Sequence, residues 1–205
     1  MRNLVIGITG GSGSGKTTLC EAFRARVGPE LVSVITSDAY YHDLGHLPPA
    51  DRSQVNYDHP DSIDGALFVE HLDELRSSRP ARVPDYDFAT HTRPGSVCLV
   101  EPRPIVVAEG VLLFCDPGVY DRLDYLIYVH APTELRLARR IARDERERGR
   151  HRDDIIRQFN ETVVPMHQIH VRPHRDRADR VVFTSEAIDE VVEELHTQFA
   201  PAFGR

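Results

Sequence analysis

Lysine is almost absent from this chain of 205 residues, although basic residues are not rare. Lysine and arginine together number 25, and because the only lysine is Lys16, the other 24 are arginines. A chain with this bias uses arginine wherever either cation would serve. We therefore expect Lys16 to occupy a place that needs a compact ammonium group on a flexible side chain.

Cysteine is also scarce, since the chain contains only Cys20, Cys98 and Cys115. Three widely separated thiols give neither a disulfide framework nor a CxxC metal-binding pattern, which favours a reducing, cytoplasmic environment. The N-terminal apolar segment is too short for a signal peptide, and no run approaches the roughly 18 apolar residues of a membrane span. These absences predict a cytoplasmic protein without a membrane partner.

The chain lacks an excess of positive charge. It has 32 acidic residues against 25 basic ones, and its formal net charge is −7. Nucleic acids and anionic membranes are bound through clustered positive charge, so both classes of partner are disfavoured. Hydrophobic residues make up 40% of the sequence and charged residues 28%, which is typical of a folded globular protein.

Apolar runs of strand length alternate with segments of helical periodicity. The predicted strands cover residues 4–9, 31–36, 105–108, 125–130 and 180–183. The predicted helices cover residues 17–27, 63–78, 132–150, 153–170 and 186–199. Strands separated by helices pair in parallel, so we predict a single α/β domain over residues 1–205, with a central parallel sheet and helices on both faces. A β-hairpin insertion is expected at about 82–100.

A glycine-rich segment joins the first predicted strand to the first predicted helix. It reads GGSGSGKT and fits the pattern G-x-x-x-x-G-K-[ST] of the phosphate-binding loop, or P-loop. In such a loop backbone N–H groups surround phosphate oxygens, the lysine reaches the β- and γ-phosphates, and the next hydroxyl binds Mg²⁺. We therefore predict a nucleoside-triphosphate site formed by Gly10, Gly11, Ser12, Gly13, Ser14, Gly15, Lys16, Thr17 and Thr18.

The single lysine also narrows the chemistry of this site. A GTPase reads guanine with an N-K-x-D segment, which this chain cannot contain because its lysine is already part of the P-loop. Motor and transporter ATPases are usually longer and carry partner-contact motifs that are not found here. The remaining class is a small kinase with a P-loop kinase fold, which transfers the γ-phosphoryl group to a bound acceptor.

Two acids follow predicted strands at the edge of the sheet that carries the P-loop. Asp38 comes after the second strand, where its carboxylate could accept the proton of an attacking hydroxyl; the alternative is a turn or helix cap. Glu109 follows the apolar run IVVA, where an acid could hold Mg²⁺ and its water shell; the alternative is a buried acid paired with an arginine.

The segments expected on the acceptor side are rich in acids, namely Asp58, Asp61, Asp64, Asp85 and Asp87. A phosphorylated acceptor would need arginines there, whereas carboxylates suit a neutral polyol whose hydroxyls donate hydrogen bonds to them. Tyr57, Tyr86 and Phe88 could form an aromatic wall for a flat ring, although core packing is the usual role of such residues.

The helix predicted over residues 132–150 is dense in arginine. Its interleaved acids make a solvated, ion-paired face the simpler explanation, and they weaken any case for RNA binding. The alternative is a lid over about 132–152 that closes on the triphosphate and neutralises developing charge. His167, His170 and His174 are not expected to form a metal site, because Pro173 interrupts their helix and no acid or thiol completes the set.

An ordered set of segments resembles the uridine kinase (uridine–cytidine kinase) family of P-loop kinases. The segments are GITGGSGSGKTT, SDAYY, NYDHPDSID, PDYDFATHTR, VVAEG and LARRIARDERERGR, and they span nearly the whole chain. NYDHPDSID and YDFATHTR separate this family from its pantothenate, phosphoribulose and nicotinamide riboside kinase relatives. The resemblance implies transfer of phosphate from ATP, or GTP, with Mg²⁺ to the 5′-hydroxyl of uridine or cytidine, and a homo-oligomer.

The resemblance also implies roles for individual residues. Asp38 is expected to be the general base, with Lys16, Arg143 and Arg148 on the phosphates and with Thr17 and Glu109 around Mg²⁺. Nucleoside contacts are expected from Asp58 and Arg140 to the ribose hydroxyls, from Tyr86, His91 and Phe88 to the pyrimidine, and from Arg150 and Gln158.

Three departures from the family pattern stand out. Ala39 replaces a hydroxyl residue after the predicted base, Val164 replaces a lysine, and VVFTSEA replaces the usual segment near the adenine, so the contacts to the nucleotide base remain open. Two other functions also remain open: a P-loop kinase for another nucleoside or a vitamin, and a non-catalytic nucleotide-binding regulator.

Overall fold

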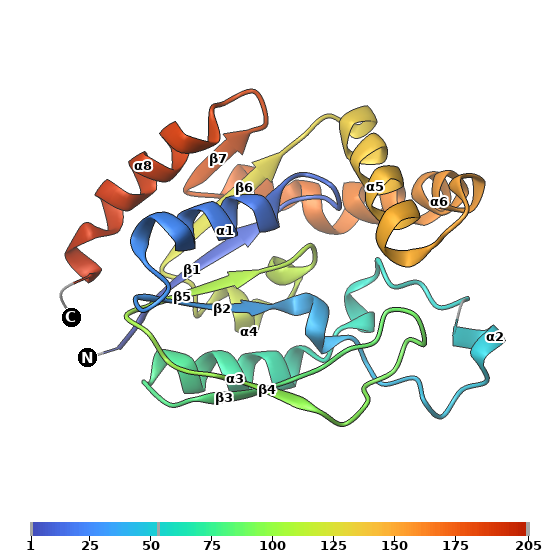
Figure 1. Cartoon of the computed structure of the whole chain (residues 1–205), viewed down its shortest axis with the longest axis horizontal. Coiled ribbons are helices and arrows are strands. Elements are labelled where there is room, and N and C mark those ends of the chain that lie inside the picture. The colour runs from blue at the N-terminus through green and yellow to red at the C-terminus, as the bar shows by residue number, and fades with distance from the viewer. Residues whose placement is uncertain (1, 53, 204–205) are drawn as a thin grey trace.

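A parallel sheet of five strands lies at the centre of the molecule (Figure 1). The computed structural model describes residues 2–52 and 54–203. Across the sheet the strands are β2 (Val32–Thr36), β5 (Ile105–Glu109), β1 (Leu4–Thr9), β6 (Tyr125–His130) and β7 (Arg180–Phe183). All neighbouring strands run in parallel, with Ile6 of β1 opposite Val107 of β5 and Tyr125 of β6. The predicted parallel sheet is confirmed.

Helices cover both faces of this sheet (Figure 1). Alternate side chains of β1 point to opposite faces. Ile6 and Ile8 share one buried cluster with α1 (Lys16–Val27) and α8 (Ile188–Phe199). Val5 belongs to the other cluster, with side chains of α3 (Gly65–Arg76) and α4 (Pro117–Tyr120). Because both faces are buried, the strands are mostly apolar, as is typical of all-parallel sheets.

The β-hairpin insertion predicted at about 82–100 is present, and its two strands are short. β3 (Ala81–Pro84) pairs antiparallel with β4 (Val97–Val100), and their pairing stops at Pro84 and Val97. Residues 85–96 form an extended tip. Asp87 ties this tip together, because its carboxylate accepts hydrogen bonds from Ala89 N (2.8 Å) and Thr90 Oγ1 (2.7 Å).

Two helices form an arm beyond the carboxyl edge of the sheet. They are α5 (Thr133–Arg148) and α6 (Arg152–Gln158), and Gly149 separates them with a left-handed backbone (φ 60°). The helix predicted over residues 153–170 is not regular: after α6 the chain continues as wide helical turns to residue 171, with α7 (Val164–Met166) among them.

The long segment after β2 is less irregular than its composition of proline, aspartate and histidine predicts. It contains α2 (Pro49–Arg52) and two 3-10 turns, Ser37–Tyr40 and Pro60–Ser62. Further 3-10 turns lie at Leu113–Cys115, Arg172–Arg177 and Ala200–Ala202. Among the described residues, no helix combines the length and apolar character needed to cross a membrane. Cys20, Cys98 and Cys115 are free thiols.

Candidate active site

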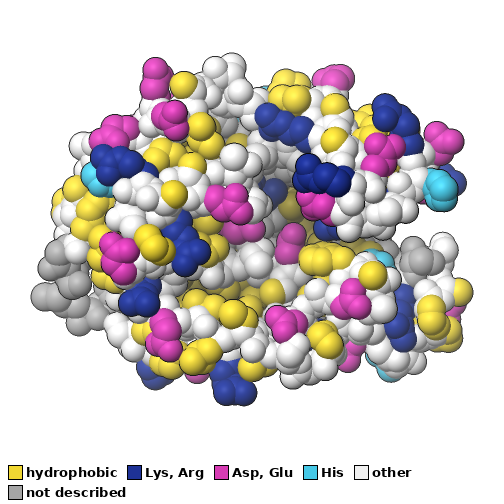
Figure 2. All heavy atoms as spheres, in the orientation of Figure 1, with side chains coloured by type: hydrophobic (Ala, Val, Ile, Leu, Met, Phe, Trp, Pro, Cys, Tyr) yellow, Lys and Arg dark blue, Asp and Glu magenta, His cyan; other side chains and the backbone are white. Residues whose placement is uncertain are grey.

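A cleft of about 520 Å³ opens at the carboxyl edge of the sheet, where the loops after β1, β2 and β5 meet. Its other walls come from the α5–α6 arm, the hairpin tip and the start of α8. Figure 2 shows the molecule hollowed between the arm and the lobe that carries α2. Loops at the carboxyl ends of parallel strands are where such folds bind ligands.

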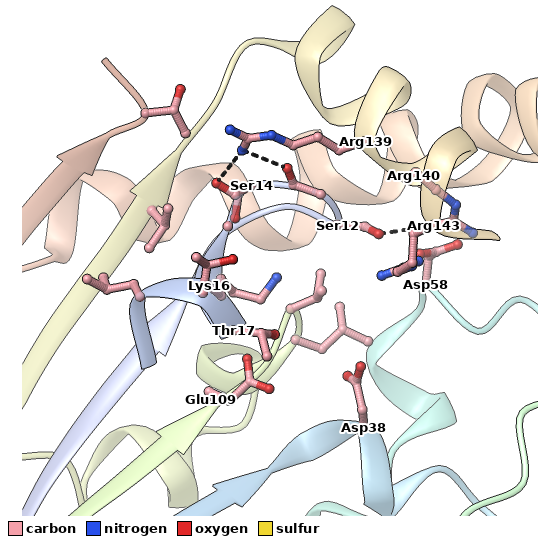
Figure 3. Close-up of a pocket in the computed structure, with 18 of the residues that line it drawn as sticks. Ser12, Ser14, Lys16, Thr17, Asp38, Asp58, Glu109, Arg139, Arg140 and Arg143 are labelled. Carbon is pink, nitrogen blue, oxygen red and sulfur yellow. Dashed lines mark hydrogen bonds between the residues drawn. The ribbon is translucent and has the colours of Figure 1, made fainter. Parts of the chain in front are cut away.

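The P-loop forms the floor of this cleft (Figure 3). Gly13 and Gly15 have positive φ angles of 79° and 102°, which glycine adopts without strain. A Cβ on Gly13 would lie 2.5 Å from the carbonyl oxygen of Arg136, so the loop packs directly on α5. Arg139 of α5 donates hydrogen bonds to Gly13 O (3.3 Å) and Ser14 O (3.2 Å).

Lys16 and Glu109 are opposite charges buried together beneath the loop. Their exposed fractions are only 7% and 8%. Burial lowers the pKa of Lys16, and the nearby Glu109 and Asp38 carboxylates oppose that shift. Burial likewise raises the pKa of Glu109, and Lys16 opposes it. Lys16 Nζ donates a hydrogen bond to Gly11 O (3.2 Å), which leaves ammonium protons for further acceptors in the cleft.

Asp38 faces the P-loop from the 3-10 turn that follows β2 (Figure 3). Its backbone N–H donates to Thr36 Oγ1 (3.3 Å), so the side chain of Thr36 caps the turn and the carboxylate of Asp38 is left to point into the cleft. Glu109 is the last residue of β5 rather than the residue after it. The ends of two neighbouring strands thus place both acids beside Lys16.

Asp58 lies against the arginines of the arm (Figure 3). Burial raises its pKa, and the charge of Arg140 opposes the rise. Arg140 itself is 7% exposed and donates to Ser12 Oγ (3.2 Å) and to Gln158 Oε1 (3.0 Å). Thr162 Oγ1 lies within 3.4 Å of Asp58 Oδ2. These contacts tie the P-loop, the arm and the loop that carries Asp58 to one another.

Aromatic rings line the end of the cleft farthest from the P-loop. Tyr57 stacks on His91 with ring centres 4.2 Å apart and planes 13° apart. Tyr86 lies 5.2 Å from Tyr41 and 5.1 Å from Phe88, measured between ring centres. Burial, and then the charges of nearby arginines, lower the pKa of His91, which keeps the ring neutral near pH 7. This end of the cleft suits a flat, uncharged ring.

Comparison with known proteins matches the sequence of this chain to a kinase family. The family model described as "Phosphoribulokinase / Uridine kinase family" matches residues 5–189. The chain belongs to the phosphoribulokinase/uridine kinase family.

Individual relatives agree with the family model. The chain is 42% identical over 180 residues to the uridine kinase of Chloroflexus aurantiacus, which covers 88% of this chain and 86% of the relative. It is 40% identical over 181 residues to the uridine kinase of Clostridium perfringens, covering 88% and 87% of the two chains. The relatives therefore share most of their length with this chain.

Solved structures share its fold. A structure described as a possible uridine kinase from Bacillus stearothermophilus has a TM-score of 0.63 at 21% identity, covering 89% of each chain. The D-glycerate 3-kinase of Cryptococcus neoformans has a TM-score of 0.62 at 16% identity and covers 82% of this chain and 78% of its own. At these identities the likeness establishes the fold alone, which is that of P-loop kinases.

The site residues predicted for a member of this family converge on the one cleft. All of them line it except Gly10 and Gly11, whose α-carbons pack against Val129 O and the Arg136 side chain behind the loop. Arg148, predicted to contact phosphates, lies over the Phe88 ring at the aromatic end, with its guanidinium carbon 4.7 Å from the ring centre. The structure fixes these positions, and the individual roles stay predictions.

The expectation that five aspartates crowd the acceptor side is wrong for four of them. Only Asp58 lines the cleft. Asp64 caps α3 by accepting from Leu67 N (3.2 Å) and pairs with Arg93 (3.2 Å). Asp87 holds the hairpin tip, and Asp61 and Asp85 are exposed. Short-range capping of turns and helices accounts for Asp64 and Asp87, and this common use of aspartate is hard to separate from a binding role by sequence.

Three residues in or beside the cleft were not predicted from the sequence. Tyr41 lies near both Asp38 and Asp58, and burial, together with the charges of these two carboxylates, raises the pKa of Tyr41 well above its usual value. Arg139 donates a hydrogen bond to the P-loop, and Thr162 contacts Asp58. Tyr41 stands in the SDAYY segment and could have been found there. Nothing in the sequence distinguishes Arg139 from its neighbouring arginines, because only the helix phase brings it over the loop.

The residues present fit a nucleotide and Mg²⁺. The Ser14 hydroxyl is buried in the P-loop without a hydrogen-bond partner, as expected of a group that completes its bonding with a phosphate oxygen. Thr17 and Glu109 offer the hard oxygen ligands that Mg²⁺ prefers, and such sites also use waters and phosphate oxygens. Within residues 2–52 and 54–203, no group of three or more His, Cys, Asp or Glu residues could hold a metal ion.

Proposed function

We propose that this enzyme transfers the γ-phosphoryl group of ATP, with Mg²⁺, to the 5′-hydroxyl of uridine or cytidine and so produces UMP or CMP. The curated relatives described above are uridine kinases at 40–42% identity. The observation that carries the proposal is the position of Asp38 in one cleft between the buried Lys16 and an aromatic end suited to an uncharged ring.

The proposed reaction balances through Asp38. The 5′-oxygen of the nucleoside attacks the γ-phosphorus, the bond from that phosphorus to the β–γ bridging oxygen breaks, and ADP leaves. Asp38 accepts the hydroxyl proton as the new P–O bond forms. Lys16 and Arg143 stabilise the negative charge on the transferring group, and they are already oriented before the reaction begins. Positioning and charge stabilisation supply most of the catalysis.

Thr17 and Glu109 are proposed to hold Mg²⁺. When bound, the ion would offset the negative charge of the triphosphate. Glu109 is suited to this task because it lies next to Lys16, whose charge opposes the rise in the pKa of Glu109 that burial causes. Thr17 lies in the first turn of α1, where the N–H groups of the helix favour anions.

The base of the donor nucleotide is proposed to bind at the opposite end of the cleft from the acceptor. The walls there are Phe183 at the end of β7, Thr184 directly after it, and Ile188 at the start of α8. Glu186 is held in place by Arg180 (2.6 Å) and by Phe183 N–H (2.6 Å). We propose ATP as the donor and keep GTP as the alternative, since these residues replace the family's usual segment.

We further propose that residues 1–205 act as one kinase domain in the cytoplasm, as a homo-oligomer. The part of the arm over about 132–152, which contains α5, would act as the lid. Arg139 connects the arm to the P-loop, and Arg148 connects it to the hairpin tip. Closure of the lid would therefore change both the nucleotide site and the acceptor site.

The test is ADP release measured with ATP and Mg²⁺ over a panel of acceptors: uridine, cytidine, purine nucleosides, hydroxylated vitamins and sugar phosphates. We expect turnover with uridine and cytidine, and none with sugar phosphates, which the Asp58 carboxylate would repel. Turnover confined to another neutral acceptor would replace the pyrimidine nucleoside in the proposal. Binding of ATP without acceptor-dependent ADP release would indicate a regulator and reject the kinase.

A further inference from the structure

Asp144 lies at the centre of the arginine-rich end of α5, and its side chain is completely buried (0% exposed). Its Oδ1 lies 2.8 Å from Arg143 Nη2 and 3.8 Å from Arg148 Nη1. Its Oδ2 lies 3.5 Å from Arg140 Nε and 3.4 Å from Arg150 Nη1. One carboxylate therefore divides its two oxygens between two pairs of guanidinium groups.

The backbone at the end of α5 creates this arrangement. The Asp144 carbonyl oxygen accepts hydrogen bonds from the N–H groups of Gly149 and Arg150, the latter at 3.2 Å. The left-handed conformation of Gly149 (φ 60°) turns the chain back along the helix. This turn brings Arg150 beside a carboxylate six positions earlier in the chain.

The two oxygens of Asp144 serve opposite sides of the cleft. Arg143, on Oδ1, lies close enough to Lys16 that its charge contributes to lowering the pKa of that lysine. Arg140 and Arg150, on Oδ2, lie close enough to Asp58 to lower its pKa against the effect of burial. The same carboxylate thus holds one arginine toward the P-loop and two toward the acceptor side.

Gln158 of α6 completes the acceptor-side half of this network. Its Oε1 accepts hydrogen bonds from Arg140 Nη2 (3.0 Å) and Arg150 Nη1 (2.8 Å). An amide oxygen carries no net charge, so it orients the two guanidinium groups but does not offset their repulsion. Asp144 is the acid that ion-pairs with all four arginines.

We propose that Asp144 is a positioning residue that fixes the donor-side and acceptor-side arginines in one arrangement, so that both substrates are aligned by a group that touches neither. This inference rests on the proposed function. Without the carboxylate, four cations within a few ångströms repel one another and turn toward solvent. Part of the binding free energy of each substrate is then spent on ordering these arginines again, on both sides of the cleft.

The test is a kinetic comparison of Asp144→Asn with Arg143→Gln and Arg150→Gln. We expect Arg143→Gln to raise mainly the KM for ATP, and Arg150→Gln to raise mainly the KM for uridine. Asp144→Asn is expected to raise both KM values about tenfold and to lower kcat about 100-fold, since small misplacements of catalytic groups have effects of this size. If Asp144 served stability alone, the variant would lose active protein while both KM values stayed at the wild-type value, which would overturn the proposal.

A matched control is Asp154→Asn on α6, an acid of an exposed pair with Arg157 (2.6 Å) that does not line the cleft. It is expected to leave kcat and both KM values unchanged. Should Asp144→Asn not fold, a double-mutant cycle with Arg143→Gln and Arg150→Gln tests the link. We expect the change in kcat/KM of the double variant to differ from the product of the changes in the two single variants. A change equal to that product would contradict the proposal that Asp144 couples the two arginines.

Binding of a non-hydrolysable ATP analogue, followed by thermal shift, separates this inference from the proposed function. Weaker analogue binding by Asp144→Asn supports the positioning role whatever the acceptor is, and unchanged binding contradicts it. Failure of the wild-type enzyme to phosphorylate uridine counts against the proposed function alone.

Discussion

Single buried charges define the chemistry of this cleft. Lys16 and Glu109 are each more than nine-tenths buried; burial shifts the pKa of each toward its neutral form, and the charge of the other opposes that shift. Such pairs are expensive to bury and are retained where a bound ligand uses them. The sequence predicts Lys16, Asp38 and Glu109 because motif and strand ends mark them. It does not predict Arg139 or Thr162, whose positions depend on helix phase and on a contact made 104 residues away.

Lys16→Arg tests whether the single lysine is retained for its shape. The variant keeps the charge, but a planar guanidinium does not fit a buried site built for an ammonium group. We expect kcat/KM for ADP release to fall by about 100-fold or more, the size of effect seen when one charge-stabilising donor is lost. The reverse exchange Arg24→Lys on the exposed face of α1 is the control and should have no effect. Wild-type activity in Lys16→Arg would refute the argument from lysine scarcity.

At the scale of elements, the strand and helix order follows from periodicity, and the element ends do not. β1 and β6 match their predicted bounds because apolar runs buried on both faces leave little ambiguity. The helix predicted over 153–170 becomes α6 and a series of wide turns, since packing of Phe159 and Val163 decides its path. The conformation of the hairpin tip was not predicted because it depends on one isolated bridge, between Asp87 and Thr92, and on the side-chain contact of Asp87 with Thr90.

Gly149→Ala tests the turn that ends α5. The glycine has φ 60°, and nothing lies within 4 Å of an added Cβ, so the cost is that of the backbone conformation alone. We expect the free energy of unfolding, measured in urea, to fall by about 1 kcal/mol. Gly149→Asn is the matched variant and should lose less, because asparagine tolerates this conformation. Equal stability of the alanine variant and the wild type would show that the turn is not strained.

At the scale of the whole molecule, the wide helical turns after α6 meet the sheet at a buried polar contact behind the P-loop. His167 accepts or donates a hydrogen bond with Tyr128 of β6 (3.2 Å), and its ring lies against Gly11 together with Arg136. Burial, and then the charge of Arg136, lower the pKa of His167 to about 4. No pattern in the sequence predicts this contact, because the two residues are 39 positions apart in the chain and lie in different elements.

The low pKa of His167 makes the folded state sensitive to acid. With a folded pKa of about 4 and an unfolded value near 6.5, the unfolded chain binds more protons between these limits. Stability is therefore lost as the pH falls from about 6.5 toward 4. In urea unfolding at pH 7 and pH 5, we expect the wild type to lose about 1 to 2 kcal/mol more than His167→Gln. The exposed His46→Gln is the control, and an equal loss in wild type and His167→Gln would contradict the assignment.

The most direct measurement is the identity of the phosphorylated atom and its dependence on Asp38. Wild-type enzyme is incubated with uridine, ATP and Mg²⁺, the product is identified by phosphorus NMR, and uridine binding to Asp38→Asn is measured by calorimetry. We expect the 5′-monophosphate from the wild type, and from Asp38→Asn normal uridine binding with kcat lowered by about 10² to 10⁴. Phosphate on another oxygen, or near-normal turnover by Asp38→Asn, would contradict the placement of a proton acceptor between the two substrates.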